Sequence, residues 1–320
     1  MPRLVLYLLG PPRIEYDGVS VKFNTRKTLT LLVYLALSHQ RQRQDSLVNL
    51  LWPESNQVRG RALLRNSLST LRKELAESWI EADWETVALN PEGDLWVDCE
   101  RFHQLLAECE EHEHNPEKTC HRCLRPLTEA MDLYRGDFLT GFTLKDSINF
   151  DEWQRTQSQN LISVTNDGFD RLIRCLKDEG LLQKAIGYAQ RWLDLDEINE
   201  TAHQYLIELY ARSGKRVAAL NQFRECEKTL QAEPRIEPDN ETLQLYEAIK
   251  AEQIRTAPLY KRSIVAQHPR NLPRQLTSFI GREGEIEEIR QIMQNTSLLT
   301  LTGSGGGAER RAWQSKLQTI

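Results

Sequence analysis

Six polar side chains that can bind nucleic acid lie on one side of a predicted helix, residues 59–76. Leu64, Leu68, Leu71 and Leu75 recur at i, i+4, i+7 and i+11, which gives this helix one apolar stripe. Arginine on the opposite side can hydrogen-bond to guanine edges or phosphates, and asparagine and serine can reach bases. That polar side carries Arg61, Arg65, Asn66, Ser69, Arg72 and Lys73. The alternative is an amphipathic surface helix with a solvated basic face, and the helix by itself favours this simpler interpretation.

The distribution of charge is uneven along the chain. The whole protein carries a net charge of −5, yet residues 1–76 hold 12 Lys and Arg against 5 Asp and Glu, a net charge of +7. Residues 77–98 hold seven acidic residues and no basic ones. A basic block inside an acidic protein indicates a local anionic partner such as DNA, although ordinary surface charge is the commoner cause of a charge run.

A second set of chemistry-bearing residues is a glycine-rich turn after an apolar run, "LLTLTGSGGGAERRAWQ". A phosphate-binding loop reads G-x-x-x-x-G-K-[ST], because Lys grips the outer phosphates and Ser or Thr holds Mg²⁺. Here the last three positions are Ala308, Glu309 and Arg310, so we expect no ATP binding. The degenerate loop comprises Gly303, Gly305, Gly306, Ala308, Glu309 and Arg310.

The genetic code offers one explanation of this damaged loop. One permissible set of codons for residues 308–320, read from the third base of the Ala308 codon, encodes Gly-Lys-Thr-Arg-Leu-Ala-Val-Gln-Val-Ala-Asn-Tyr. That frame restores the missing G-K-T. We therefore hypothesise a single-base frameshift in the glycine-coding run. Genuine decay of the motif is the alternative, and the gene sequence decides between them.

A third set is the His/Cys stretch "CEEHEHNPEKTCHRC". Cys120 and Cys123 form C-x₂-C, and His112 and His114 precede them, so four N/S ligands can converge on zinc in a loop between helices. The alternative is a polar loop with two incidental thiols, which the spacing alone favours. Three further cysteines are expected to be ordinary buried residues: Cys99, Cys175 and Cys226.

The elements that position the 59–76 helix follow a recognisable order. Short β-rich runs, "RLVLYLL", "RIEYD" and "VSVKF", are separated by turn residues. Two further helices are predicted in "RKTLTLLVYLALSH" and in "RQDSLVNLLWP", the second capped by Asp45 or Ser46. "TVALNPEGDLWVD", residues 86–98, resembles a β-hairpin. Strands, three helices and a hairpin predict a winged helix over 1–98, whose third helix enters the major groove.

From residue 99 onward the pattern is helical. Gly180 and Gly214 are 34 residues apart, and the stretches after them match, which is typical of tetratricopeptide-like helix pairs. The predicted fold class is therefore an α+β winged helix followed by an all-α helical repeat domain, residues 99–255. Such repeats usually bind proteins or mediate self-association. Residues 256–272 are predicted to be a linker.

The bulk composition is that of a globular protein. Of its 320 residues, 40% are hydrophobic and 27% are charged. No apolar run approaches the roughly 20 residues of a membrane helix, and the first residues lack the features of a signal peptide. We expect a cytoplasmic protein with reduced cysteines and no membrane partner.

Taken together, several motifs resemble the Streptomyces antibiotic regulatory protein (SARP) family, in which a response-regulator-type winged helix precedes a bacterial transcriptional activator domain. They are "LYLLGPPRIEYDG", "RKTLTLLVYLAL", "LVNLLWPE", "RNSLSTLRKEL", "LYRGDFLTGF" and "AALNQFRECEKTLQAEPRIEPDNET". The segment containing "FIGRE" looks like the start of the family's signal-transducing NB-ARC-like ATPase module, so residues 273–320 are interpreted as its truncated fragment. The H-x-H…C-x₂-C stretch also resembles one in some multidomain members of the family, which implies a zinc site.

The resemblance implies a transcription factor that binds double-stranded promoter DNA, recruits RNA polymerase and acts as a dimer or through ligand contacts of its repeats. It places Arg65, Asn66, Ser69, Arg72 and Lys73 on the recognition helix and residues 86–98 on the wing. This wing has no Lys or Arg, so the third helix must supply most of the affinity. We expect no enzyme activity. The alternatives are an ATP-driven switch that has lost its phosphate loop and a repeat scaffold that does not bind DNA.

Overall fold

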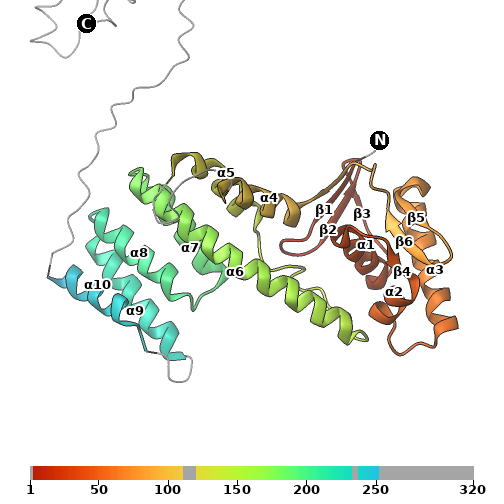
Figure 1. Ribbon diagram of the computed structural model, residues 1–320. Coiled ribbons are helices and arrows are strands. Elements are labelled where there is room, and N and C mark those ends of the chain that lie inside the picture. The colour runs from red at the N-terminus through yellow and green to blue at the C-terminus, as the bar shows by residue number, and fades with distance from the viewer. Residues whose placement is uncertain (1–2, 111–119, 233–236, 252–320) are drawn as a thin grey trace, which may run out of the picture. The chain divides into compact units, whose positions relative to one another are not determined.

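The computed structural model describes residues 3–110, 120–232 and 237–251 (Figure 1). All three ranges belong to one compact unit, Met1–Leu259. The predicted linker 256–272, the fragment 273–320 with its glycine-rich loop, and the two histidines His112 and His114 lie outside the described residues.

The first strands form a sheet, as predicted. β1 (Leu4–Tyr7), β2 (Arg13–Tyr16) and β3 (Val19–Val21) pair antiparallel, and β7 (Leu95–Val97) pairs parallel with β1. The order is β3-β2-β1-β7. The turn between β2 and β3 uses Gly18, whose φ of 79° lies in the left-handed region that glycine adopts without strain.

Three helices follow, in the predicted order. α1 (Arg26–Ser38) is capped by the hydroxyl of Thr25, which accepts the Thr28 N–H. α2 (Gln44–Leu51) and α3 (Gln57–Leu75) form the helix-turn-helix pair, shown at the right of Figure 1.

The predicted cap of the second helix is wrong. α2 begins at Gln44 after an extended Arg43, which makes no side-chain cap hydrogen bond, so Asp45 and Ser46 lie inside the first turn. The cause is the short strand β4 (Gln42–Arg43), which pairs with β6 (Thr86–Leu89) and keeps the chain extended up to the helix.

The predicted hairpin at residues 86–98 is also wrong. The antiparallel hairpin is instead β5 (Ile80–Ala82) with β6, joined through Asp83, Trp84 and Glu85, and the three-stranded sheet has the order β4-β6-β5. A one-turn 3₁₀ helix, Glu77–Trp79, links α3 to β5. The chain after β6 turns at Asn90–Gly93 and leaves this sheet to pair with β1.

The rest of the described chain is helical, as predicted. Its long element is α6, whose N-terminal end approaches α2. The helices are α4 (Asp98–Glu110), α5 (His121–Leu133), α6 (Ile148–Asp178), α7 (Leu182–Leu195), α8 (Glu200–Arg212), α9 (Arg216–Ala232) and α10 (Asn240–Lys250).

The 34-residue period corresponds to successive helix pairs. Gly180 and Gly214 both have positive φ, 71° and 75°, just beyond the ends of α6 and α8. Equivalent positions after them are buried, for example Ala185 with Ala219 and Trp192 with Cys226. Each pair therefore buries its apolar face against a neighbour, as expected for a repeat.

One hydrophobic core runs from β1 through the winged helix into α8, and a smaller one surrounds Ile207 and Phe223. The N-terminal part also connects to the helices through polar contacts. The buried carboxylate of Asp98 accepts the N–H groups of Leu8 and Leu9, at 2.8 and 3.0 Å. The hydroxyl of Ser147 donates to the carbonyl of Leu50.

Candidate nucleic-acid interface

The helix α3 is held by its apolar stripe and by a close approach to α2. Its leucine stripe is buried as predicted, with Leu64, Leu71 and Leu75 at 0% exposure. Gly60 lies against Val48 of α2, where an added Cβ would stand 2.3 Å from Val48 Cγ1. Because the leucine stripe packs in the core and the Gly60 side packs against α2, the remaining face of α3 points outward.

The predicted polar residues share this outward face. Arg61, Arg65, Asn66, Ser69 and Lys73 are exposed, and Arg72 is half-buried. The structure thus brings the six side chains together on one surface. Their DNA contacts stay a prediction.

On one flank of α3 the surface forms a groove against the β5–β6 hairpin, residues 80–89, which is the wing of this winged helix. The groove has a volume of about 690 Å³. Trp84, at the tip of the hairpin, is 81% exposed and faces this groove. Three arginines of α3 line it, together with six other residues: Gln44, Val58, Arg61, Arg65, Leu68, Arg72, Ala82, Asp83 and Trp84.

The three arginines differ in their availability. Arg61 is engaged by Asp45, with Nε donating to Oδ1 at 2.9 Å and Nη2 to Oδ2 at 3.0 Å. Arg61 lowers the pKa of Asp45 through this hydrogen bond. Arg65 forms no ion pair with any residue that the structure describes. The buried Nε of Arg72 has no hydrogen-bond partner. Among these three arginines, Arg65 is therefore exposed without an ion pair to a described residue, whereas the unpartnered Nε of Arg72 is buried.

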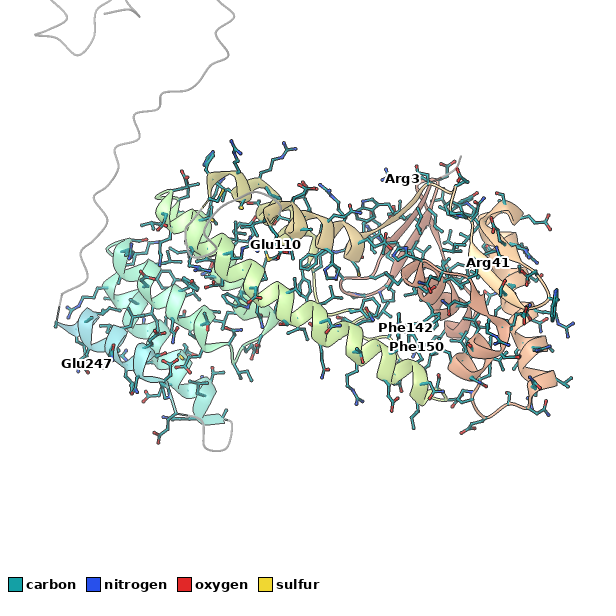
Figure 2. All side chains as sticks on the ribbon, viewed as in Figure 1. Arg3, Arg41, Glu110, Phe142, Phe150 and Glu247 are labelled. Atoms are coloured by element: carbon teal, nitrogen blue, oxygen red, sulfur yellow. The ribbon has the colours of Figure 1, made fainter. Side chains whose placement is uncertain are left out.

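The wing is acidic, and it forms ion pairs with Arg41, just before β4, and with Arg43 of β4. Arg41 pairs with Glu81 at 2.8 Å and with Asp83 at 3.1 Å, and Arg43 lies 3.9 Å from Glu85. Arg41 is labelled in Figure 2 on this side of the molecule. The corrected wing, like the predicted one, has no Lys or Arg between residues 80 and 89.

The tip of the wing is fixed by the side chain of Asp83. Its Oδ1 accepts the N–H groups of Thr86 and Glu85, at 2.6 and 2.8 Å. These backbone hydrogen bonds favour the charged carboxylate and lower its pKa from 3.8 to about 2. The tip therefore keeps its negative charge at every physiological pH, which makes it a poor partner for a phosphate.

The cysteines of the predicted zinc site lie at the junction of three helices. Cys120 precedes α5, Cys123 is in its first turn, and Cys109 is near the end of α4. The Sγ atoms of Cys109 and Cys123 each lie 3.9–4.0 Å from the other residue's carbonyl oxygen. Burial raises the pKa of Cys123 to about 12.

Cys175 of α6 joins this group, with its Sγ 4.0 Å from the carbonyl oxygen of Cys120. The sequence pattern does not connect it with the pair, because 52 residues separate Cys175 from Cys123. Thiolates are suitable zinc ligands, but within the described ranges no three His, Cys, Asp or Glu residues are arranged to hold a metal. The zinc site with His112 and His114 stays a prediction.

The helical part of the chain matches a known protein family. Residues 97–250 match the family model of the bacterial transcriptional activator domain. No curated protein matches the sequence. Among the described residues, no helix is long and apolar enough to cross a membrane.

A solved structure resembles most of the chain. Mycobacterium tuberculosis EmbR, in complex with a low affinity phosphopeptide, superposes with a TM-score of 0.57 at 22% sequence identity. The match covers 79% of this chain and 66% of the EmbR chain, so it spans just under two-thirds of that protein. It shows an EmbR-like fold, a winged helix followed by a helical activator domain. The family match concerns the helical part of the chain, and the match to EmbR shows the fold.

Proposed function

We propose that this protein regulates transcription by binding double-stranded promoter DNA with the outward face of α3. The observation that carries the proposal is the placement of six basic or polar side chains on that one face. The face belongs to the third helix of a winged helix that directly precedes a transcriptional activator domain.

The dimensions of α3 suit the major groove. Its 19 residues span about 28 Å at 1.5 Å per residue. A helix about 10–12 Å across fits a major groove about 12 Å wide. In this arrangement Asn66 and Ser69 face base edges, where Asn pairs with adenine, and Lys73 neutralises a phosphate.

Selection of DNA from a random pool by the full chain tests the binding. We expect recovery of a preferred sequence, and then binding isotherms at several salt concentrations. Lys73→Gln should weaken binding on every duplex and lower the salt slope by about 0.9, because one phosphate contact is lost. Asn66→Ala should relax sequence preference at one position, where a good bidentate contact is worth about 1–3 kcal/mol.

Lys228→Gln supplies a matched control, because Lys228 is an exposed lysine of α9, which packs against α8 and α10. Failure to recover any DNA would refute the proposal and favour a repeat scaffold that does not bind DNA. Unchanged isotherms for both the Asn66 and the Lys73 variants would show that α3 is not the reading helix.

The activator role is a separate part of this proposal. The repeats α7–α10 are assigned to contacts with RNA polymerase or with a second copy of the chain. Two of the exposed apolar residues there, Ile198 and Val217, are 47% and 73% exposed. Transcription by purified bacterial polymerase from a promoter carrying the selected site should rise when the protein is added. A fall in transcript would contradict activation and indicate repression.

A further inference from the structure

A second cleft lies on the flank of α3 that faces away from the wing. Its volume is about 600 Å³. Asn66 and Thr70 of α3 line one side, and the N-terminal turn of α1 lines another. The third side belongs to the activator domain, through residues 143–146, which precede α6. The candidate reading helix therefore lies between two grooves, one against the wing and one against the second domain.

The second cleft carries positive charge from both domains. Its lining includes Arg26 and Lys27 of α1, Lys145 of the activator domain, and one acidic side chain, Asp146. Lys145 is exposed. None of the three cations forms an ion pair with a residue that the structure describes. The contrast with the wing is direct, because Arg41 there is already paired with carboxylates.

The position of Lys145 is fixed by contacts to the winged helix. Arg26 Nη1 donates to the carbonyl oxygen of Thr143 at 3.0 Å, and its guanidinium lies 5.8 Å from the ring of Phe142. Phe142 packs edge-on against Phe150 of α6, and the two labelled rings lie side by side in Figure 2. Beyond Lys145, the buried Ser147 is hydrogen-bonded to the end of α2.

Phosphates line both sides of a major groove that holds a helix, so both flanks of α3 would face a backbone strand. A strand is bound by cations that are not already neutralised, since binding is driven by release of its counterions. The wing flank offers Arg65 and Arg72 beside acidic residues. The other flank offers a net charge of +2 from its four charged residues.

The geometry points to the second cleft as a phosphate-backbone contact to which the activator domain contributes Lys145. This inference rests on the DNA-binding function proposed above, and it adds a partner residue from outside the winged helix. Lys27 and Lys145 contact the DNA strand on the flank of α3 opposite the wing. The missing basic residues of the wing are thus compensated on the other side of the helix.

The test compares full-length wild type with Lys145→Gln, Lys145→Arg, Lys27→Gln, Lys73→Gln and the control Lys228→Gln. Each is titrated into a fluorescent duplex recovered by the wild type and into a random-sequence duplex, at several salt concentrations. Lys145→Gln should bind about 5-fold more weakly near 0.15 M salt, with a salt slope lower by about 0.9, as expected for one lost phosphate contact. The loss should be equal on both duplexes, because phosphates carry no sequence information. Lys145→Arg should retain wild-type binding.

The outcomes separate this inference from the function on which it rests. If Lys145→Gln matches wild type while Lys73→Gln binds more weakly, the activator domain contributes no phosphate contact and this inference is wrong, while α3 remains the reading helix. If Lys27→Gln also matches wild type, no part of the second cleft contacts the phosphates. A loss for Lys145→Gln on the selected duplex alone would also overturn the phosphate assignment. If the wild type binds neither duplex, both proposals fall.

Discussion

Asp98 is a carboxylate without exposed surface at the point where the winged helix meets the activator domain. Its Oδ1 accepts the N–H groups of Leu8 and Cys99, and its Oδ2 accepts the N–H of Leu9. Nη2 of Arg135 also donates to Oδ2, at 3.1 Å. Burial raises the pKa of this carboxyl, while the two backbone donors and Arg135 oppose that shift. The side chain thus satisfies three main-chain donors, of which Leu8 and Leu9 belong to β1 and its extension and lie about ninety residues away in the sequence.

Asp98→Ala should destabilise the fold by about 2–6 kcal/mol, because the buried N–H groups of Leu8 and Leu9 lose their acceptor, at a cost of about 1–3 kcal/mol each. Arg135 adds little to this figure, since its side chain is 43% exposed and water can replace the carboxylate. Asp98→Asn should lose less than Asp98→Ala, because its amide keeps one acceptor oxygen.

The assay is urea unfolding of the full chain, followed by far-UV circular dichroism and tryptophan fluorescence, with midpoints compared at equal slope. Asp94→Ala is the control, because Asp94 is 58% exposed and its pairing with Arg3 spans 3.8 Å. It should change stability by no more than about 0.5 kcal/mol. A loss below about 1 kcal/mol for Asp98→Ala would refute the reasoning, since it would mean that both N–H groups find other acceptors.

Three further predictions concern other sites. Gly60→Ala should lower the free energy of unfolding in urea, because the clash of its Cβ with Val48 costs about 1–3 kcal/mol, while the better helix propensity of alanine offsets about 1 kcal/mol of that cost. An unchanged urea midpoint would contradict the close packing of α2 on α3. The Asp83 carboxyl should titrate near pH 2 by NMR instead of near 3.8. Its contribution to stability is therefore present above pH 3.8 and is lost as the pH falls toward 2. A titration midpoint near 3.8 would contradict the hydrogen bonds of this turn. Purified wild type should contain zinc by mass spectrometry and the Cys120→Ser, Cys123→Ser double variant should not, whereas a metal-free wild type would refute the zinc hypothesis.

The misplaced wing shows where local sequence patterns lose their power. Residues 90–93, Asn-Pro-Glu-Gly, carry a strong turn signal, and the pattern on either side alternates as in a hairpin. Yet β7 pairs with β1, some ninety residues earlier, which no local pattern reveals. The true turn contains a bulky Trp84 and is closed by the side chain of Asp83, so it lacks the usual glycine signal.

Helix periodicity was more informative, because it depends on one element at a time. It correctly indicated which residues of α3 face the core and which face outward. It could not indicate that Arg61 is paired with Asp45, sixteen residues earlier on α2. Nor could it place Lys145 in the same cleft as Asn66, because that cleft depends on the docking of the activator domain.

The hydrogen bonds that dock the activator domain on the winged helix leave the outward face of α3 unused. Asp98 accepts main-chain N–H groups of β1 and its extension, Ser147 donates to the carbonyl of Leu50, and Asn149 donates to the carbonyl of Asn49 at 3.0 Å. In these three contacts the activator domain supplies the side chain and the winged helix supplies backbone, whereas Arg26 of α1 donates in the other direction, to the carbonyl oxygen of Thr143. Backbone groups are the same whatever side chain a position carries, so these contacts hold the two domains together without using a side chain of α3. If α3 binds DNA as proposed, its outward residues can therefore differ with the DNA sequence, while Lys145 stays in the cleft that Asn66 also lines.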